Sequence, residues 1–110
     1  MNIVGEIRCY LGNEYAQLKF SESINSFSID TVIVPASHRN KGIGKLLINH
    51  ILCLADSMKK DVRLSARPLG AFSEEKLQRL VSYYNKFSFQ TLDRGLTAVY
   101  MVRKAKESET

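Results

Sequence analysis

A chain of 110 residues is long enough to bury one hydrophobic core and too short for two domains. Its 45% hydrophobic and 25% charged residues are ordinary for a globular protein, and no apolar run is long enough to span a bilayer. The formal net charge of +5 would suit an anionic ligand, but the cations are spread along the chain without an aromatic–basic repeat. We therefore expect neither nucleic acid nor a membrane as the main partner.

The sequence contains few signals for cellular location or for metal binding. The N-terminal residues lack the basic and apolar regions of a secretory leader, so a cytoplasmic location is expected. Cys9 and Cys53 fall in a predicted strand and a predicted helix, which favours buried thiols over a disulfide. Two histidines and two cysteines occur at no short ligand spacing, so no metal site is predicted.

The chain begins with a predicted hairpin and a central strand. Residues 3–11 and 15–21 alternate apolar and polar side chains around a turn at 12–14. Residues 27–34 alternate again, are rich in β-branched side chains, and end at Pro35, which has no N–H for a ladder. The alternation predicts one strand face with Phe27, Ile29, Thr31 and Ile33, and the other with Ser28, Asp30, Val32 and Val34.

The apolar spacing changes from that of a strand to that of a helix at Ile43. The predicted helix runs to Met58, with one apolar stripe made of Ile43, Leu46, Leu47, Ile51, Leu54 and Met58. Lys59 and Lys60 place positive charge at its C-terminal end, where the helix dipole favours it. Residues 62–66 alternate as the next strand, which predicts a βαβ unit with parallel strands and a right-handed crossover.

A second helix and two short strands complete the predicted fold. Ser73 has the position of an N-cap, and the apolar stripe that follows contains Leu77, Leu80, Val81 and Tyr84. Strands are predicted at 89–92 and 96–102, around a turn at 93–95.

The whole layout is β-β-β-α-β-α-β-β. It predicts an α/β fold of the mixed α+β kind, with a mixed sheet of about six strands and two main helices. Residues 1–103 are expected to form one domain, and residues 104–110 a frayed polar tail.

The junction between the central strand and the first helix is a candidate anion site. The first turn of a helix presents unpaired N–H groups and partial positive charge. Gly42 and Gly44 leave the backbone accessible there, and Arg39, Lys41 and Lys45 add full positive charge. These features favour a phosphate or pyrophosphate ligand. The alternative is a glycine turn before a helix, with basic residues that are merely solvated.

The pattern VxVPxxxRNKGIGKLLI narrows the choice among phosphate-containing ligands. A Walker loop would need a hydroxyl at Leu46, and a dinucleotide fingerprint would need a third glycine at Leu47. The pattern instead resembles the acyl-CoA motif Arg-x-x-Gly-x-Gly of the Gcn5-related N-acetyltransferases (GNAT superfamily). The resemblance implies that the main chain of Val32, Ile33 and Val34 pairs with the pantetheine arm of acetyl-CoA. It implies a pyrophosphate site at Arg39, Asn40, Lys41, Gly42, Ile43, Gly44 and Lys45.

A second segment is similar to the same family. A helix after the fifth strand often ends Tyr-x-x-x-Gly-Phe in that family, and Tyr84 and Phe89 match this pattern while Ser88 replaces the glycine. The resemblance implies that Tyr84 is the general acid that protonates the coenzyme A thiolate. The alternative is a core tyrosine with a satisfied hydroxyl. Tyr83 is adjacent, but its position does not match.

The general base is less clear from the sequence. Asp30 is expected on the same strand face as Val32 and Val34, where it could point into the acceptor groove and accept the proton of the amine. It could equally be a solvated strand residue, and some family members use a chain of waters. A main-chain N–H near Val32 to Val34 is expected to bind the oxyanion.

The sequence therefore predicts a transferase that moves an acetyl group directly from acetyl-CoA to an amine of a small molecule, peptide or protein. The chain starts almost at the hairpin and lacks the N-terminal strand and helices common in the family, so it resembles a trimmed member. Its acceptor site is then either open or completed by a second subunit, as in a homodimer, or by another protein. The alternatives are an inactive CoA-binding module that acts through protein contacts, and nucleic-acid binding without coenzyme A.

Overall fold

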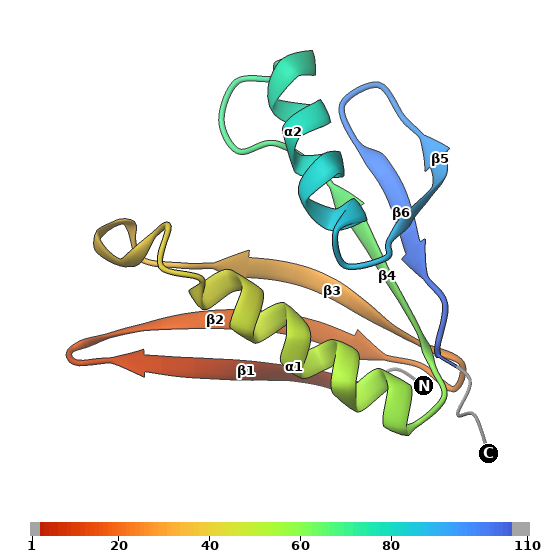
Figure 1. The fold of residues 1–110 in the computed structure, drawn as a ribbon, viewed down its shortest axis with the longest axis horizontal. Coiled ribbons are helices and arrows are strands. Elements are labelled where there is room, and N and C mark those ends of the chain that lie inside the picture. The colour runs from red at the N-terminus through yellow and green to blue at the C-terminus, as the bar shows by residue number, and fades with distance from the viewer. Residues whose placement is uncertain (1–2, 107–110) are drawn as a thin grey trace.

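The computed structural model describes residues 3–106, which form one mixed sheet with two helices (Figure 1). The hairpin consists of β1 (Ile3–Leu11) and β2 (Glu14–Glu22), and β3 (Ser26–Ile33) follows. A short 3₁₀ turn at 36–38 leads to α1 (Ile43–Ser57), and then come β4 (Asp61–Ala66), α2 (Glu74–Asn85), β5 (Gln90–Arg94) and β6 (Val99–Arg103). The predicted element order is confirmed.

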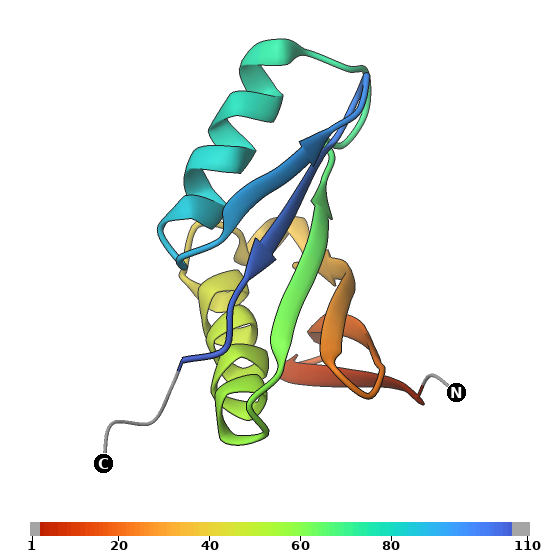
Figure 2. The ribbon, with the colours of Figure 1, turned by 90° about the vertical axis from the view of Figure 1, so that its right-hand side faces the viewer.

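The six strands lie in the order β1-β2-β3-β4-β6-β5. Only β3 and β4 run parallel, as the βαβ prediction requires, and every other neighbouring pair is antiparallel. Both helices cover the same face of the sheet (Figure 2). The sheet therefore has a helix-covered face, which forms the core, and a helix-free face.

The core lies between α1 and the covered face. The buried residues of α1 form a stripe that differs from the predicted one: Leu47, Ile48, Ile51, Leu52 and Ala55. Three predicted members are wrong, because Leu46, Leu54 and Met58 are exposed by 60%, 37% and 44%. Apolar residues occupy more of this helix than one stripe, so spacing alone could not show which side faces the sheet.

Two other expectations need correction. Cys53 is exposed rather than buried because it lies beside the buried stripe of α1, whereas Cys9 is half-buried on the covered side of β1. The last hairpin turns later than predicted, since β5 continues to Arg94 past an irregularity between Thr91 and Asp93, and the Gly95 amide donates to the Ala98 carbonyl at 2.8 Å. Neither helix within residues 3–106 is long and apolar enough to cross a bilayer.

The start of the expected tail is anchored. The Ala105 amide donates to the Asp61 carboxylate at 2.9 Å, and the Lys106 amide donates to the Asp56 carboxylate at 3.2 Å. The first part of the expected tail is therefore tied to β4 and α1, and residues 107–110 lie outside the described part of the chain.

Candidate active site

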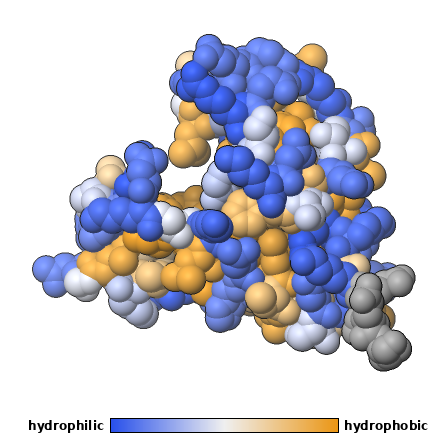
Figure 3. All heavy atoms as spheres, in the orientation of Figure 1, coloured by the Kyte–Doolittle hydropathy of each residue, from blue (hydrophilic) through white to orange (hydrophobic). Residues whose placement is uncertain are grey.

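The sheet divides between its two parallel strands. The β3–β4 ladder pairs Ser26–Ile29 with Asp61–Leu64, and beyond it β4 offers no partner to residues 30–33. The strands diverge there and open a cleft of about 700 Å³ on the side of α2. Figure 3 shows the surface hollowed between the β3 side and the α2 side, with hydrophobic residues at the base. The unpaired edge of β3 and the apolar lining of the cleft are both available to an extended ligand.

A β-bulge in β3 explains this divergence. Phe20 pairs with Ile29 and Lys19 with Thr31, so Asp30 is an extra residue without a partner on β2. A bulge bends its strand and increases the local twist. It also shifts the alternation by one residue, so that side chains change faces from this point onward.

The predicted faces of β3 are therefore wrong beyond Asp30. Val32 and Val34 pack against the core on the covered side, whereas Ile33 is 48% exposed. Asp30 lies at the helix-free face and not on the face of the two valines, because its Oδ2 accepts a hydrogen bond from the Ser21 hydroxyl at 2.7 Å. It still lines the cleft, because the bulge lies at the edge of the opening.

The glycine loop has the local geometry of an open helix N-terminus. Gly42 is the N-cap residue of α1 with φ 79°, a left-handed conformation that disfavours other residues, and no side chain caps the helix. The first helical bond is from the Leu46 amide to the Gly42 carbonyl at 3.0 Å. The amides of Ile43, Gly44 and Lys45 precede that bond, so they are the free N-terminal donors of α1.

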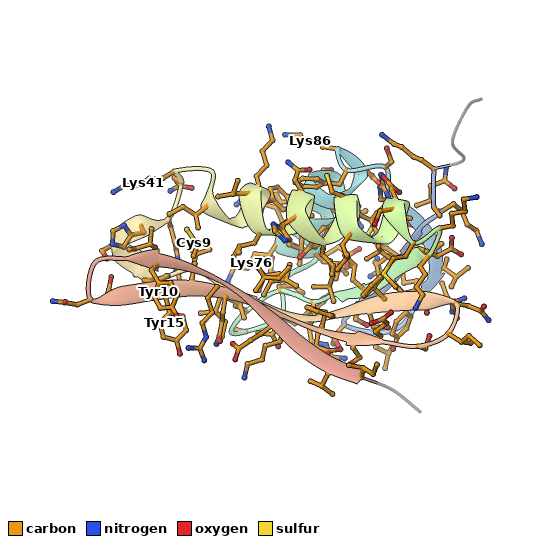
Figure 4. The ribbon with its side chains drawn as sticks, turned by 90° about the horizontal axis from the view of Figure 1, so that it is seen from below. Cys9, Tyr10, Tyr15, Lys41, Lys76 and Lys86 are labelled. Atoms are coloured by element: carbon orange, nitrogen blue, oxygen red, sulfur yellow. The ribbon has the colours of Figure 1, made fainter. Side chains whose placement is uncertain are left out.

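The charged residues of the loop have different positions. The Arg39 Nε donates to the Val34 carbonyl at 3.2 Å, so this side chain folds back and closes the base of the loop. Lys41 extends away from the loop into solvent (Figure 4). Asn40 has φ 65° and helps the chain to turn. The loop therefore offers mainly backbone N–H donors to a ligand. Its Lys41 side chain is a long cation that extends into solvent beside them.

Tyr83 connects the loop to the cleft, although sequence reasoning set it aside. It lines the cleft, and its Oη lies 3.7 Å from the position of a Cβ added at Gly44. None of residues 39–45 lines the cleft itself, so the glycine loop and the cleft are separate surfaces that share Tyr83 as a neighbour. The helical spacing of Lys76, Leu80 and Tyr83 indicates that the three residues lie on one side of α2. This spacing could have identified them as one wall of the cleft.

Tyr84 also lines the cleft and is half-buried. Burial raises the pKa of its phenol above the ordinary value of 10.0, and the adjacent Tyr83 raises this pKa further. The two tyrosine rings meet edge to face at 5.4 Å, and Tyr84 meets Phe89 in the same way at 5.8 Å. These two contacts orient the ring of Tyr84, and its phenol is protonated at neutral pH because its pKa lies above 10.0.

The end of α2, which positions Tyr84, is strained at Ser88. The Phe89 amide donates to the Tyr84 carbonyl at 3.3 Å and the Ser88 amide to the Asn85 carbonyl at 3.0 Å, the pattern of a Schellman motif. Ser88 takes the left-handed position of that motif with φ 73°. The departure from the family glycine therefore has a local conformational cost.

Replacing Ser88 by glycine should stabilise the fold by about 1 kcal/mol, because glycine enters the left-handed region without the steric cost of a Cβ. Thermal or urea unfolding measures the change. Ser82→Gly is the matched control, since Ser82 is exposed within α2. Glycine at this helical position should lower the free energy of unfolding by about 0.5 kcal/mol. A Ser88→Gly variant no more stable than the original chain would refute the strain at this position.

Two further cavities adjoin these elements. One of about 470 Å³ lies between α1 and the end of α2, and its walls include Tyr83 and the basic residues Lys45, Lys86, Arg103 and Lys106. The other, of about 570 Å³, lies on the helix-free face beside Arg63, Asp93 and Tyr100. This groove shares Ile29, Asp30, Leu64 and Ser65 with the cleft, so the two openings meet where the sheet divides.

A mixed sheet that divides between parallel strands, with an open helix N-terminus after the first of them, defines the GNAT acyltransferase fold. No protein-family model and no curated protein sequence matches the chain. Solved structures do match it over most of its length.

Three of these structures illustrate the likeness. The anti-CRISPR protein AcrVA5 is 20% identical, over 87% of this chain and 97% of that one, with a TM-score of 0.65. The ribosomal-protein-S18-alanine N-acetyltransferase of Escherichia coli is 11% identical, over 96% and 72%, with a TM-score of 0.75. The PaiA N-acetyltransferase of Thermoplasma acidophilum, solved in complex with coenzyme A, is 14% identical, over 92% and 60%, with a TM-score of 0.72. The chain has the GNAT fold that its two motifs predicted.

Proposed function

We propose that this chain is an N-acetyltransferase that transfers an acetyl group directly from acetyl-CoA to a primary amine. The observation that carries the proposal is the cleft between β3 and β4, with Tyr84 in its wall. Its volume of about 700 Å³ is suited to the acyl and pantetheine part of such a substrate. The coenzyme A complexes among proteins of the same fold support this substrate.

Each predicted binding segment has a role in this proposal. The free edge of β3 at Val32 and Ile33, and the main chain of Val34 just after it, would pair with the amides of the pantetheine arm, as an added strand does. Within the predicted segment Arg39 to Lys45, the free amides of Ile43, Gly44 and Lys45 at the N-terminus of α1 would hold the pyrophosphate, whereas the Arg39 amide already donates to the Ala36 carbonyl at 3.4 Å. Lys76, together with Arg67 and Arg79, makes the cleft wall cationic, which complements a polyanionic substrate.

The chemistry would take place where the cleft meets the helix-free face. The amine nitrogen attacks the thioester carbonyl carbon, and a main-chain N–H near Val32 to Val34 stabilises the oxyanion that forms. As the intermediate collapses, the C–S bond breaks and Tyr84 donates its phenolic proton to the thiolate. Asp30 accepts the proton of the amine directly or through water. The groove beside Asp30 would admit the acceptor from the face opposite to α2.

A CoA-binding module without catalysis is the second candidate. One observation favours it: Asp30 is the one carboxylate among the described residues that line the cleft, and it already accepts a hydrogen bond from Ser21. Calorimetry with acetyl-CoA, combined with thiol release measured over a panel of primary amines, separates the candidates. We expect binding and amine-dependent thiol release. Binding without release for any amine would favour the module, and no binding would refute both.

Gly42→Ala should weaken acetyl-CoA binding by roughly tenfold, because a Cβ there strains the loop and projects into open space beside the free amides. Gly12→Ala is the matched control, since Gly12 has a similar φ of 72° with nothing nearby, but lies in the β1–β2 turn. Calorimetry should show unchanged affinity for Gly12→Ala. Equal affinity in both variants would contradict the phosphate position.

A further inference from the structure

The free edge of β1 is unusual for a monomeric sheet. β1 pairs with β2 along its whole length, from Ile3 opposite Glu22 to Leu11 opposite Glu14, without a break in register. Its other edge meets no described element, and Figure 4 looks directly onto it. Exposed edge strands are commonly protected by lysine, proline, a bulge or short length. β1 has nine residues without lysine, proline or a bulge, and its two charged residues, Glu6 and Arg8, form an ion pair with each other.

The turn after β1 shows which backbone groups face outward. Gly12 and Asn13 form a two-residue turn, so Leu11 and Glu14 are the hydrogen-bonded pair that closes the hairpin. Odd-numbered residues of β1 therefore bond to β2. The amides and carbonyls of the even-numbered residues point away from the sheet and can accept another strand; these residues are Val4, Glu6, Arg8 and Tyr10.

The outward-facing residues carry side chains that suit a partner. Val4 and Tyr10 are 75% and 70% exposed. Between them, the Arg8 Nη2 and the Glu6 Oε1 form an ion pair at 3.0 Å, and the Arg8 guanidinium lies 4.5 Å from the ring centre of Tyr15. Tyr10 and Tyr15 lie on the helix-free side of the strand and Cys9 on the side of α1 (Figure 4). Apolar groups thus flank a central pair of opposite charges.

We propose that β1 pairs antiparallel with β1 of a second copy of this chain, about a two-fold axis at Ile7. In this register Glu6 faces Arg8 of the partner subunit, and Arg8 faces Glu6 of the partner subunit. Val4 faces Tyr10 of the partner subunit, and Ile3 faces Leu11 of the partner subunit. Every charge then meets its opposite, and each exposed apolar side chain meets another.

Neighbouring registers are less favourable for a physical reason. A shift of the axis to position 6 places Glu6 opposite its own copy, and a shift to position 8 does the same for Arg8. Like charges directly opposite each other destabilise a strand pair. Either shift also shortens the ladder. The sequence of β1 is therefore self-complementary about Ile7 alone, and the resulting sheet would run continuously through both copies with both α1 helices on one face.

Analytical ultracentrifugation over a range of concentrations tests the pairing. We expect a dimer for the original chain, and monomers for Glu6→Arg and for Arg8→Glu, because each variant places like charges opposite each other. An equimolar mixture of the two variants should dimerise again, since each then supplies the charge that the other needs. The double variant with both changes should also be dimeric. Circular dichroism checks that every variant is folded.

A monomeric original chain at all concentrations would overturn the proposal, as would single variants that dimerise like the original. A cross-link gives a second measurement that does not depend on charge. Ile7→Cys, in a background with Cys9→Ser and Cys53→Ser, should form an intermolecular disulfide on oxidation, because position 7 faces its own copy across the axis. Its failure to cross-link in a dimeric protein would overturn this register. The pairing does not depend on acetyl-CoA, since β1 lies two strands from the cleft.

Discussion

Replacing Tyr84 by phenylalanine should lower the rate of acetyl transfer by roughly 10²- to 10⁴-fold and leave the affinity for acetyl-CoA nearly unchanged. The ring keeps its edge-to-face contacts with Tyr83 and Phe89, so only the proton donor is lost. Thiol-release kinetics give the rate, and calorimetry gives the affinity.

Two control variants test whether Tyr84 is the proton donor. Tyr15→Phe removes a hydroxyl from β2, away from the cleft, and should be without effect on the rate. Tyr83→Phe tests the neighbouring cleft tyrosine, and its rate should fall less than that of Tyr84→Phe. If the Tyr83 variant loses more, the assignment of the donor is wrong.

The pKa of Tyr84 gives this prediction a pH dependence. Burial, then the adjacent Tyr83, raise its pKa above 10.0, so the phenol stays protonated through neutral and mildly alkaline pH. The rate should therefore show no loss from this group until the pH exceeds the ordinary tyrosine range. The Tyr84→Phe variant should lack that alkaline decline, because it has no group that loses the proton.

The largest effect on stability is expected from Asp56→Asn. The Arg103 guanidinium donates to both carboxylate oxygens of Asp56, at 2.8 and 3.0 Å, and joins β6 to α1. Arg103 is only 4% exposed, so loss of its partner leaves a buried charge without compensation. The free energy of unfolding should fall by about 3 kcal/mol. Urea unfolding measures it, and Arg79→Ala, which breaks an exposed pair with Glu75, should cost no more than about 0.5 kcal/mol.

The same pair predicts sensitivity to acid. Arg103 first, with the Lys106 amide, lowers the pKa of Asp56 below its ordinary value of 3.8. The folded state therefore binds this proton less readily than the unfolded chain, so the pair contributes its full stability above pH 3.8. That contribution is lost as the pH falls through the lower, folded-state pKa. Asp56→Asn should flatten the acid side of the stability profile, and an unchanged profile would contradict the coupling.

Much of the fold could be predicted because the local patterns agree with one another. The strand period, the helix period and the turn residues indicated the element order and the parallel βαβ unit, and the structure confirms both. The two family motifs indicated the GNAT fold, which solved structures of that fold confirm.

The bulge at Asp30 was not predictable in the same way. It is a property of two paired strands, since β2 spans two residues where β3 needs three. A period-two pattern within β3 contains no sign of it, so the faces of Val32, Ile33 and Val34 were predicted incorrectly. The position of Asp30 followed from the same error.

Side-chain contacts between residues far apart in the sequence could not be predicted from the sequence pattern either. Arg103 is a polar strand end in the sequence, and only the folded arrangement of α1 and β6 brings it to Asp56. Arg39 was counted among the cations of the loop, and no pattern in the sequence indicates that its side chain donates to the Val34 carbonyl. Tyr83 was set aside because it does not match the family motif, yet it lines the cleft beside Gly44. Each case depends on how two elements meet.

The central claim is that free main-chain amides at the start of α1 hold the phosphates of acetyl-CoA while the thioester lies between β3 and β4. An NMR titration of ¹⁵N-labelled protein with acetyl-CoA tests it most directly. We predict the largest amide shifts at Gly42 to Lys45 and at Val32 to Val34. Binding that leaves both segments unshifted, or the absence of any binding, would contradict the claim.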